Sequence, residues 1–197
     1  MHNLNVKLCA AAIASAMSAT AIPAQAGDPY MLDASHTTVM FGVSHLGFSK
    51  QFGRFNKVEG AFTLDEAAPD KSSVVVTIDA ASIDSNDAKR DEHLRGKDFF
   101  EVETYPALTY KSTAVKKTGE NTAAVTGDLT MHGVTRPVTL EVTLAKAGPH
   151  PVDNTKIMAG FSARGTLKRS DFGMSYGVPV LGDEIELIIE TEAIKQP

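Results

Sequence analysis

The chain has 197 residues, a formal net charge of −5, no tryptophan and one cysteine. A mildly acidic chain without a block of basic residues is a poor candidate for binding nucleic acid. Because the one cysteine, Cys9, lies close to the start of the chain, the rest of the sequence offers no disulfide, no thiol nucleophile and no thiolate metal site.

The first 26 residues have the pattern of a secretory signal peptide. Lys7 precedes a small apolar run over 8–19, and an A-x-A cleavage site ends at Ala26. The apolar run is shorter than the roughly 20 residues that a membrane-spanning helix needs. We therefore expect cleavage between Ala26 and Gly27, export to the periplasm without stable membrane insertion, and a single folded domain over 27–197.

Apolar and polar residues alternate in eight segments of the remaining chain. One apolar face and one polar face are typical of antiparallel strands. Short turn sequences such as His132-Gly133 separate several of the segments, and no strand–helix–strand alternation indicates a parallel sheet. The predicted strands cover 38–43, 58–65, 74–79, 108–110, 125–131, 138–144, 157–163 and 184–190.

Eight amphipathic strands form either a closed barrel or a two-layer sandwich. Closure removes exposed edge strands, which favours a barrel in an all-β chain without disulfides. A barrel of this size either fills its interior with side chains or encloses one small ligand. Small residues at the inner positions Gly60, Gly127, Ala159 and Ala163 leave room for a cavity, but neighbouring phenylalanine side chains are equally able to fill it.

One polar, charged segment interrupts the strand pattern between the third and the fourth strand. Its sequence predicts a short helix that is capped by Ser85 or Asn86 and ends at Arg95, with Gly96 in the position after the helix. A second and shorter helical segment is predicted over 168–172.

The predicted helix has two compatible interpretations. In the first, which we favour, it covers one end of the barrel: Arg90, Asp91 and Arg95 form ion pairs with loop carboxylates, and Leu94 plugs the opening. In the second, a cationic rim holds an anionic or polar head group, because the planar fork of arginine binds phosphate or carboxylate in bidentate fashion. The head-group candidates are His45, Arg90, His93 and Arg169.

No motif of catalysis or metal binding is present in the sequence. The histidines lack the H-E-x-x-H spacing, and the nucleophile elbow, the P-loop and the dinucleotide fingerprint are absent. We therefore assign no catalytic residue, no metal site and no cofactor. An enzyme that uses His45 or His93 beside Arg90 is an alternative, because ionisable groups cluster near the expected mouth.

Several short motifs follow one another along the chain, over 33–36, 41–47, 53–55, 82–84, 90–106, 127–138, 168–174 and 182–185. Their order resembles that of the YceI-like family of polyisoprenoid-binding periplasmic proteins. Each motif alone is weak, but their joint order is specific and spans nearly all of 29–194. One departure is Gly96, where many relatives have serine.

The resemblance implies an eight-stranded antiparallel barrel, lipocalin-like but extended, whose lumen takes a long amphiphile such as a polyprenyl chain, a quinone tail or a fatty-acyl derivative. We therefore expect an exported protein that binds, stores or carries a small-molecule lipid, and a homodimer is compatible with this expectation. With such a ligand, the enzyme alternative becomes one that acts on an isoprenoid or quinone lipid, and a solid barrel with a surface, adhesion or stress-related role is a further alternative. The apolar residues expected to line the lumen are Phe41, Val43, Phe62, Leu108, Tyr110, Leu129, Leu140, Val142, Phe161 and Leu187.

Overall fold

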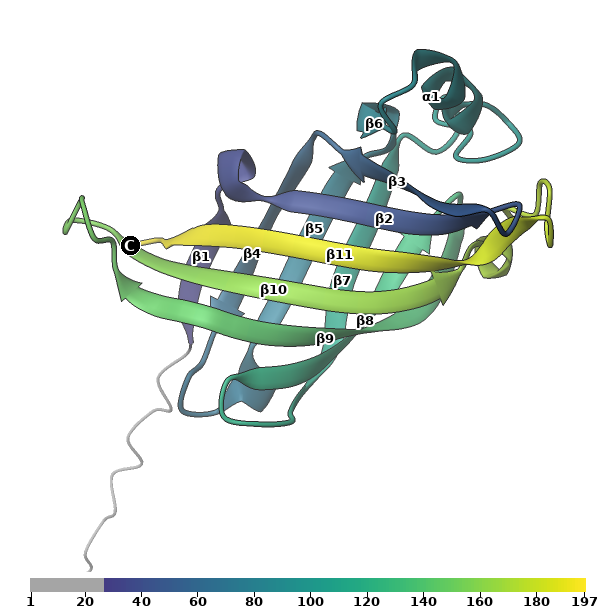
Figure 1. Cartoon of the computed structure of the whole chain (residues 1–197). Helices are drawn as coiled ribbons and strands as arrows, with labels where there is room; N and C mark the ends of the chain where they lie inside the picture. Colours follow the sequence, from purple (N-terminus) through teal and green to yellow (C-terminus); the bar gives the residue numbers. More distant parts are fainter. Residues whose placement is uncertain (1–26) are drawn as a thin grey trace, which may run out of the picture.

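The computed structural model describes residues 27–197, and the predicted signal peptide lies outside these described residues. Figure 1 shows an elongated barrel in which long front strands cross the back strands at a large angle. The eleven strands of the described part are β1 (Asp28–Leu32), β2 (Thr38–His45), β3 (Ser49–Phe55), β4 (Val58–Leu64), β5 (Ser73–Asp79), β6 (Ile83–Asp84), β7 (Ala107–Lys117), β8 (Thr122–Met131), β9 (Val134–Pro149), β10 (Ile157–Lys168) and β11 (Leu181–Lys195).

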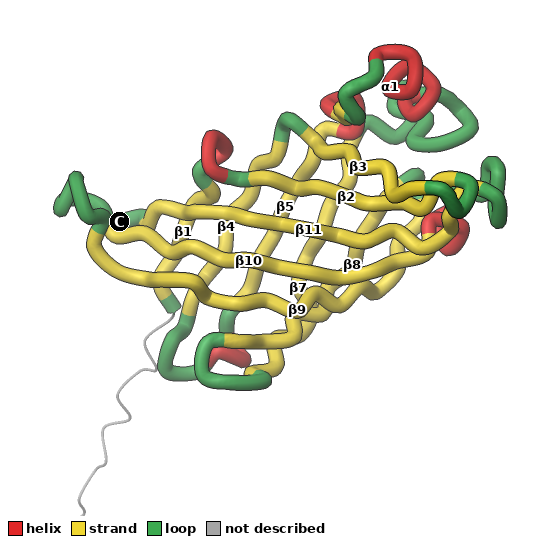
Figure 2. Tube along the Cα trace, in the orientation of Figure 1, coloured by secondary structure: helices red, strands yellow, loops and turns green. Residues whose placement is uncertain are grey.

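Loops and short helices lie at the ends of the strands (Figure 2). None of the helices formed by residues 27–197 is long and apolar enough to cross a membrane. The helices are α1 (Ala88–Arg95) and the 3₁₀ helices η1 (Ala34–His36), η2 (Pro69–Lys71), η3 (Ala80–Ser82) and η4 (Arg169–Phe172).

Six of the shorter strands combine into three long, interrupted strands. β1 and β2 both pair with β11, with Tyr30 opposite Lys195 and Val39 opposite Ile189, and η1 lies between them. β1 also pairs with β4, and β2 with β3, so β3 and β4 form a second such strand. β5 pairs with β4 and β6 pairs with β3, so β5 and β6 form the third such strand.

The resulting eight long strands close into one ring. The neighbours are β1–β4–β5–β7–β8–β9–β10–β11, and the ring closes through the pairing of β1 with β11. All of these pairings are antiparallel. The predicted eight-stranded antiparallel barrel is confirmed, and each predicted strand lies within a different one of the eight long strands.

β3 was not predicted, because its side chains do not follow the expected alternation. Phe52 lies on the outer face, half exposed, whereas the buried residue beside it is Gly53. Gly53 is opposite Phe41 on β2, and a Cβ at Gly53 would collide with the Phe41 ring. The glycine therefore makes room for an inward-pointing aromatic ring, which no count of apolar residues along β3 reveals.

Helix α1 lies between β6 and β7, as predicted, but its cap differs from the prediction. The carboxylate of Asp87 accepts the backbone N–H of Arg90 at 2.9 Å, so Asp87 is the N-cap rather than Ser85 or Asn86. Gly96 follows the helix with φ −77°, a conformation that serine also adopts. The second predicted helical segment is η4.

Candidate functional site

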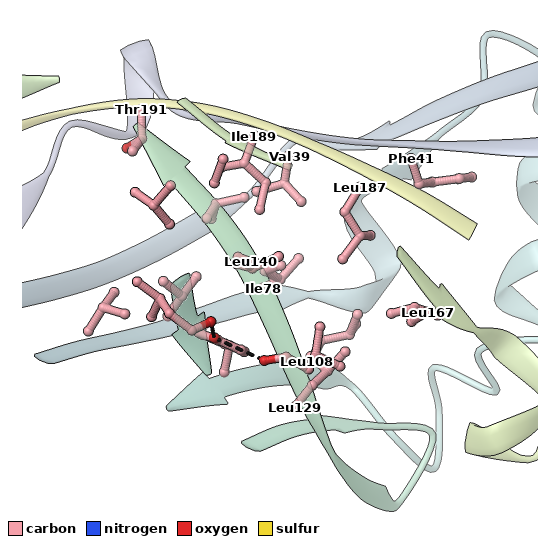
Figure 3. Close-up of a pocket in the computed structure, with 18 of the residues that line it drawn as sticks. Val39, Phe41, Ile78, Leu108, Leu129, Leu140, Leu167, Leu187, Ile189 and Thr191 are labelled. Carbon is pink, nitrogen blue, oxygen red and sulfur yellow. Dashed lines mark hydrogen bonds between the residues drawn. The ribbon is translucent and has the colours of Figure 1, made fainter. Parts of the chain in front are cut away.

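An apolar cavity of about 860 Å³ lies inside the barrel. In Figure 3, Val39, Leu187 and Ile189 on one side and Leu140 and Leu129 on the other point toward the same space. Side chains from every strand except β6 contribute to the wall. The barrel is therefore not solid, and the alternative of a filled interior is wrong.

The alternation of side chains along each strand produces this apolar wall. On β9, Val138, Leu140 and Val142 line the cavity, while Thr139 and Glu141 between them are exposed on the outer surface. Successive residues of a strand point to opposite faces, so an alternating sequence yields one wet and one dry surface. Of the four small positions noted above, only Ala163 lines the cavity.

Neighbouring groups take up the space at the other three small positions, although at Gly127 and Gly60 these groups are Tyr110 and Val75 rather than phenylalanine side chains. A Cβ at Gly127 would lie 2.5 Å from Cζ of Tyr110, so the tyrosine ring takes that space. Ala159 packs with Tyr30 and Ala193 in a separate core cluster. A Cβ at Gly60 would lie 2.6 Å from the carbonyl oxygen of Val75.

All ten residues predicted to line the lumen contribute to the cavity wall, while their contact with a ligand stays a prediction. They are Phe41, Val43, Phe62, Leu108, Tyr110, Leu129, Leu140, Val142, Phe161 and Leu187. The prediction omitted Phe55 and Phe100, whose rings meet edge to face at 5.6 Å, and both line the cavity. Neither belongs to a predicted strand, so the alternation gave no signal for them.

Tyr110 is the polar member of this wall. Its hydroxyl donates to the carbonyl oxygens of Val125, at 2.9 Å, and Val138, at 3.3 Å. Burial, with a smaller contribution from Asp128, raises the pKa of Tyr110 to about 12. The side chain is therefore neutral at physiological pH and presents its ring to the cavity.

We expect Tyr110→Phe to lower the free energy of unfolding by about 1 kcal/mol at neutral pH, the usual net contribution of a hydrogen bond. In the wild type, the folded state holds the phenolic proton up to pH about 12, whereas the unfolded chain releases it near pH 10. Between these values the unfolded chain binds fewer protons, so wild-type stability falls as pH rises.

The Tyr110→Phe variant lacks this contribution, so its free energy of unfolding should fall less than that of the wild type as pH rises from about 10 toward about 12. Urea unfolding at pH 9, 10 and 11 would measure this difference. Tyr30, whose pKa is also raised by burial, contributes equally in both proteins. An identical alkaline loss in both would show that Tyr110 is not its source.

An aromatic cluster lies at the end of the cavity that is next to α1. The ring of His93 meets the rings of Phe99, at 5.0 Å, and Tyr176, at 5.1 Å, and those two rings are 5.4 Å apart. His93 Nε2 lies 2.8 Å from a carboxylate oxygen of Asp98. The cluster joins the α1 segment to the loop before β11, and His45 also lines the cavity at this mouth.

The arginines of α1 hold the helix in place through backbone carbonyls. Arg90 donates to the carbonyl and hydroxyl oxygens of Ser85, and Arg95 donates to the carbonyls of Ala81 and Ile83. Asp91 accepts from the N–H and hydroxyl of Ser85. The predicted ion pairs with loop carboxylates are therefore wrong, because Arg90 and Arg95 bind backbone carbonyls in and beside η3 and β6 instead.

Arg169 is a buried anchor of the loop between η4 and β11. Its side chain is 5% exposed, and its guanidinium donates to the carbonyl oxygens of Met174 and Gly182 at 2.8 and 2.9 Å. It also donates to those of Tyr176 and Leu181. Burial lowers the pKa of Arg169, although the nearby Asp183 opposes this. Although Arg169 lines the cavity, its hydrogen bonds favour a structural role over the predicted head-group role.

The cavity also reaches the end of the barrel that is remote from α1, where its lining is acidic and polar. Asp65 and Glu66 follow β4, and Lys117 and Glu120 lie where β7 turns into β8. In Figure 1 these turns lie at the lower edge, far from α1. This second mouth was not predicted from the sequence, since charged turn residues have no periodicity. Among residues 27–197, no three His, Cys, Asp or Glu side chains are grouped so as to hold a metal ion.

Comparison with known proteins places this geometry in a family. A profile described as the YceI-like domain matches residues 30–193. A UPF0312 protein of Pseudomonas aeruginosa is 42% identical over 195 residues, which cover 98% of this chain and all of that relative.

Two solved structures have the same fold. BcnA of Burkholderia cenocepacia aligns with a TM-score of 0.74 and 28% identity, covering 82% of this chain and 98% of BcnA. A domain of Saccharophagus degradans, described as a polyisoprenoid binding domain implicated in plant cell wall breakdown, aligns with a TM-score of 0.63 and 19% identity. That alignment covers 85% of this chain and 98% of the other.

Proposed function

The chain belongs to the YceI-like domain family, and from this premise we propose that it binds, stores or carries a long amphiphilic lipid, such as a polyisoprenoid, an isoprenoid quinone or a fatty-acyl derivative, in the barrel lumen. The observation that carries this proposal is the apolar cavity of about 860 Å³. The likeness to the Saccharophagus domain is at 19% identity and supports the fold alone, so the ligand class rests on the chemistry of the cavity.

An apolar chain suits this cavity better than a polar ligand does. Each methylene group that moves from water into an apolar site contributes about 0.8 kcal/mol. Ordering a long chain offsets part of this gain. A polar ligand would lose its hydrogen bonds to water and find few partners between Leu108, Leu129, Leu140 and Leu187.

The two mouths differ in a way that supports one orientation of the lipid. We propose that the polar head lies at the α1 mouth, near His45 and His93, and that the tail extends toward the mouth lined by Asp65 and Glu66. Carboxylates at that second mouth would repel a phosphate or carboxylate head. Both histidines are exposed, and His45 can meet a head group directly, whereas His93 Nε2 already lies 2.8 Å from an Asp98 carboxylate oxygen and the Arg90 guanidinium bonds to Ser85.

We further propose that the protein binds its lipid without transforming it. After incubation with an isoprenoid quinone or a polyprenyl phosphate, the lipid recovered from wild type and from His93→Ala should have its original mass in chromatography coupled to mass spectrometry. His36→Ala is the matched control, because His36 is exposed and pairs with Asp33 away from the cavity. A product formed by wild type and His36→Ala but not by His93→Ala would establish catalysis instead.

The test of the proposed function uses protein isolated from the periplasmic fraction of its native host. Organic extraction followed by mass spectrometry should return one class of long-chain amphiphile in near-stoichiometric amount, and the N-terminal residue of the protein should be Gly27. A reproducibly empty protein would contradict lipid binding, and an uncleaved chain in another fraction would contradict export.

A further inference from the structure

Large apolar side chains are exposed together at the α1 mouth of the barrel. Phe48 in the turn between β2 and β3 is 91% exposed, and Leu46 in the same turn is about half exposed. Tyr176 and Val180 in the loop before β11 are also about half exposed or more. We call these four residues the apolar rim.

The two segments of the apolar rim are held side by side. The N–H of Leu46 donates to the carbonyl of Val180 at 3.2 Å, and His45 pairs with Leu181 across β2 and β11. The N–H of Phe48 donates to the carbonyl of His45 at 3.0 Å, which closes the turn. Figure 1 shows both segments projecting together from the right-hand end of the barrel.

The apolar rim borders the opening of the cavity. Tyr176 belongs to the rim and lines the cavity, and His45 and Leu181, the neighbours of Leu46 and Val180, line it as well. The rings of His93 and Phe99 contact Tyr176 from the α1 side. The apolar surface therefore continues from the outside of the molecule into the lumen at this mouth.

Among residues 27–197, the opposite end exposes fewer large apolar side chains together. In the hairpin of β9 and β10, Val152 is 89% exposed and Ile157 is 36% exposed. The cavity lining at that end includes Asp65, Glu66 and Glu120 with Lys117, whereas the lining at the α1 mouth includes His45, Arg90, His93 and Arg169, with one carboxylate, Asp98, paired to His93. An anionic lipid surface attracts basic groups and repels acidic ones, so it distinguishes the two ends.

We propose that the apolar rim docks the protein on the surface of a phospholipid bilayer, with the α1 mouth facing the lipid. This proposal rests on the proposed function, because a lumen for a water-insoluble lipid has to exchange that lipid with a membrane. Phe48, Leu46 and Val180 would enter the interface, and Tyr176 would place its ring there with its hydroxyl in water, as aromatic residues do at membrane surfaces. Docking is reversible and involves no membrane-spanning segment.

The test measures co-sedimentation of the full exported protein with vesicles of phosphatidylethanolamine and phosphatidylglycerol. Wild type should partition onto the vesicles, and Phe48→Ser should weaken the partition coefficient about tenfold, the effect of one lost large apolar contact. Val152→Ser removes an equally exposed apolar side chain from the opposite end and should behave as wild type. All three proteins should show the same thermal unfolding midpoint, because both side chains lie outside the core.

Equal partition of wild type and Phe48→Ser, or no partition of wild type, would overturn the docking proposal. A change in sedimentation velocity of Phe48→Ser, with vesicle binding unaltered, would instead assign the rim to contact between two copies of the chain. Extraction of bound lipid from the same preparations separates this proposal from the proposed function. Protein that contains lipid but does not bind vesicles would refute docking alone. Protein that never contains lipid would refute the proposed function of the lumen.

Discussion

Replacing Leu140 with arginine is expected to abolish lipid binding, with a loss of at least about 100-fold in affinity. Leu140 is 9% exposed and points into the centre of the cavity from β9 (Figure 3). A guanidinium at this position has no counter-charge among the aliphatic side chains around it, and a lipid tail cannot cover it without burying an unpaired charge, which costs several kcal/mol. Titration with a fluorescent isoprenoid probe measures the loss.

Thr139→Arg is the matched control for this experiment. Thr139 precedes Leu140 on the same strand but lies exposed on the outer face, where its hydroxyl is 2.8 Å from that of Thr126. The control introduces the same side chain and should bind the probe as tightly as wild type. If Leu140→Arg has the circular dichroism spectrum of a folded barrel and binds as well as Thr139→Arg, the lumen is not the binding site.

Replacing Arg169 with methionine is expected to lower the free energy of unfolding by about 3 kcal/mol or more, because a hydrogen bond to a charged group contributes about 1.5–3 kcal/mol and several are lost together. The guanidinium joins η4 to the carbonyl of Met174 on the loop that leads into β11 and to that of Gly182 at the start of β11. Arg169→Lys should restore little, since an ammonium group lacks the planar fork that reaches several carbonyls at once. Urea unfolding at neutral pH measures both variants.

Arg164→Met serves as the control for removal of an arginine from the barrel surface. Arg164 bonds to Glu190 at 2.6 Å, and both side chains are about half exposed, so its loss should cost at most about 1 kcal/mol. Lipid binding by the same variants decides whether Arg169 has a structural role or contacts the head group. A fully stable Arg169→Met protein with weakened lipid binding would reverse our assignment and make Arg169 a head-group contact.

The fold could be predicted from the sequence where each strand has one dry and one wet face. β9 is the clearest example, because Val138, Leu140 and Val142 alternate with threonine and glutamate. β3 could not be predicted in this way, since a glycine lies inward beneath a ring from β2 and a phenylalanine lies outward. Whether a small residue on one strand lies opposite a large residue on its neighbour depends on the register of the two strands. The sequence of one strand alone does not determine that register.

The apolar wall of the candidate site followed from the same alternation, but the polar groups at its ends did not. Arg169 in the sequence has the appearance of a free cation beside a short helix. Its burial depends on carbonyls from the loop between Gly173 and Gly182, which fold over it only in the tertiary structure. The second mouth was missed for a related reason, because the pairing of β4, β5, β7 and β8 places Asp65 and Glu120 at the same end of the barrel.

The N-cap of α1 was predicted one or two residues too early in the chain. Ser85, Asn86 and Asp87 are all good N-cap residues by type. Ser85 is instead held by Asp91, and Asn86 has a positive φ of 62°, so the cap falls to Asp87. A competing side-chain contact six residues away decided the position, and such a contact is visible only in the folded chain.

The crystal structure of the protein saturated with a polyisoprenoid tests the central claim most directly. We expect continuous electron density along the cavity between Leu140 and Leu187, with the polar end beside His45 and His93 and the tail directed toward Asp65. Density for the lipid on the outer surface of the barrel, or a cavity holding only water after saturation, would contradict the assignment of the lumen as the lipid site.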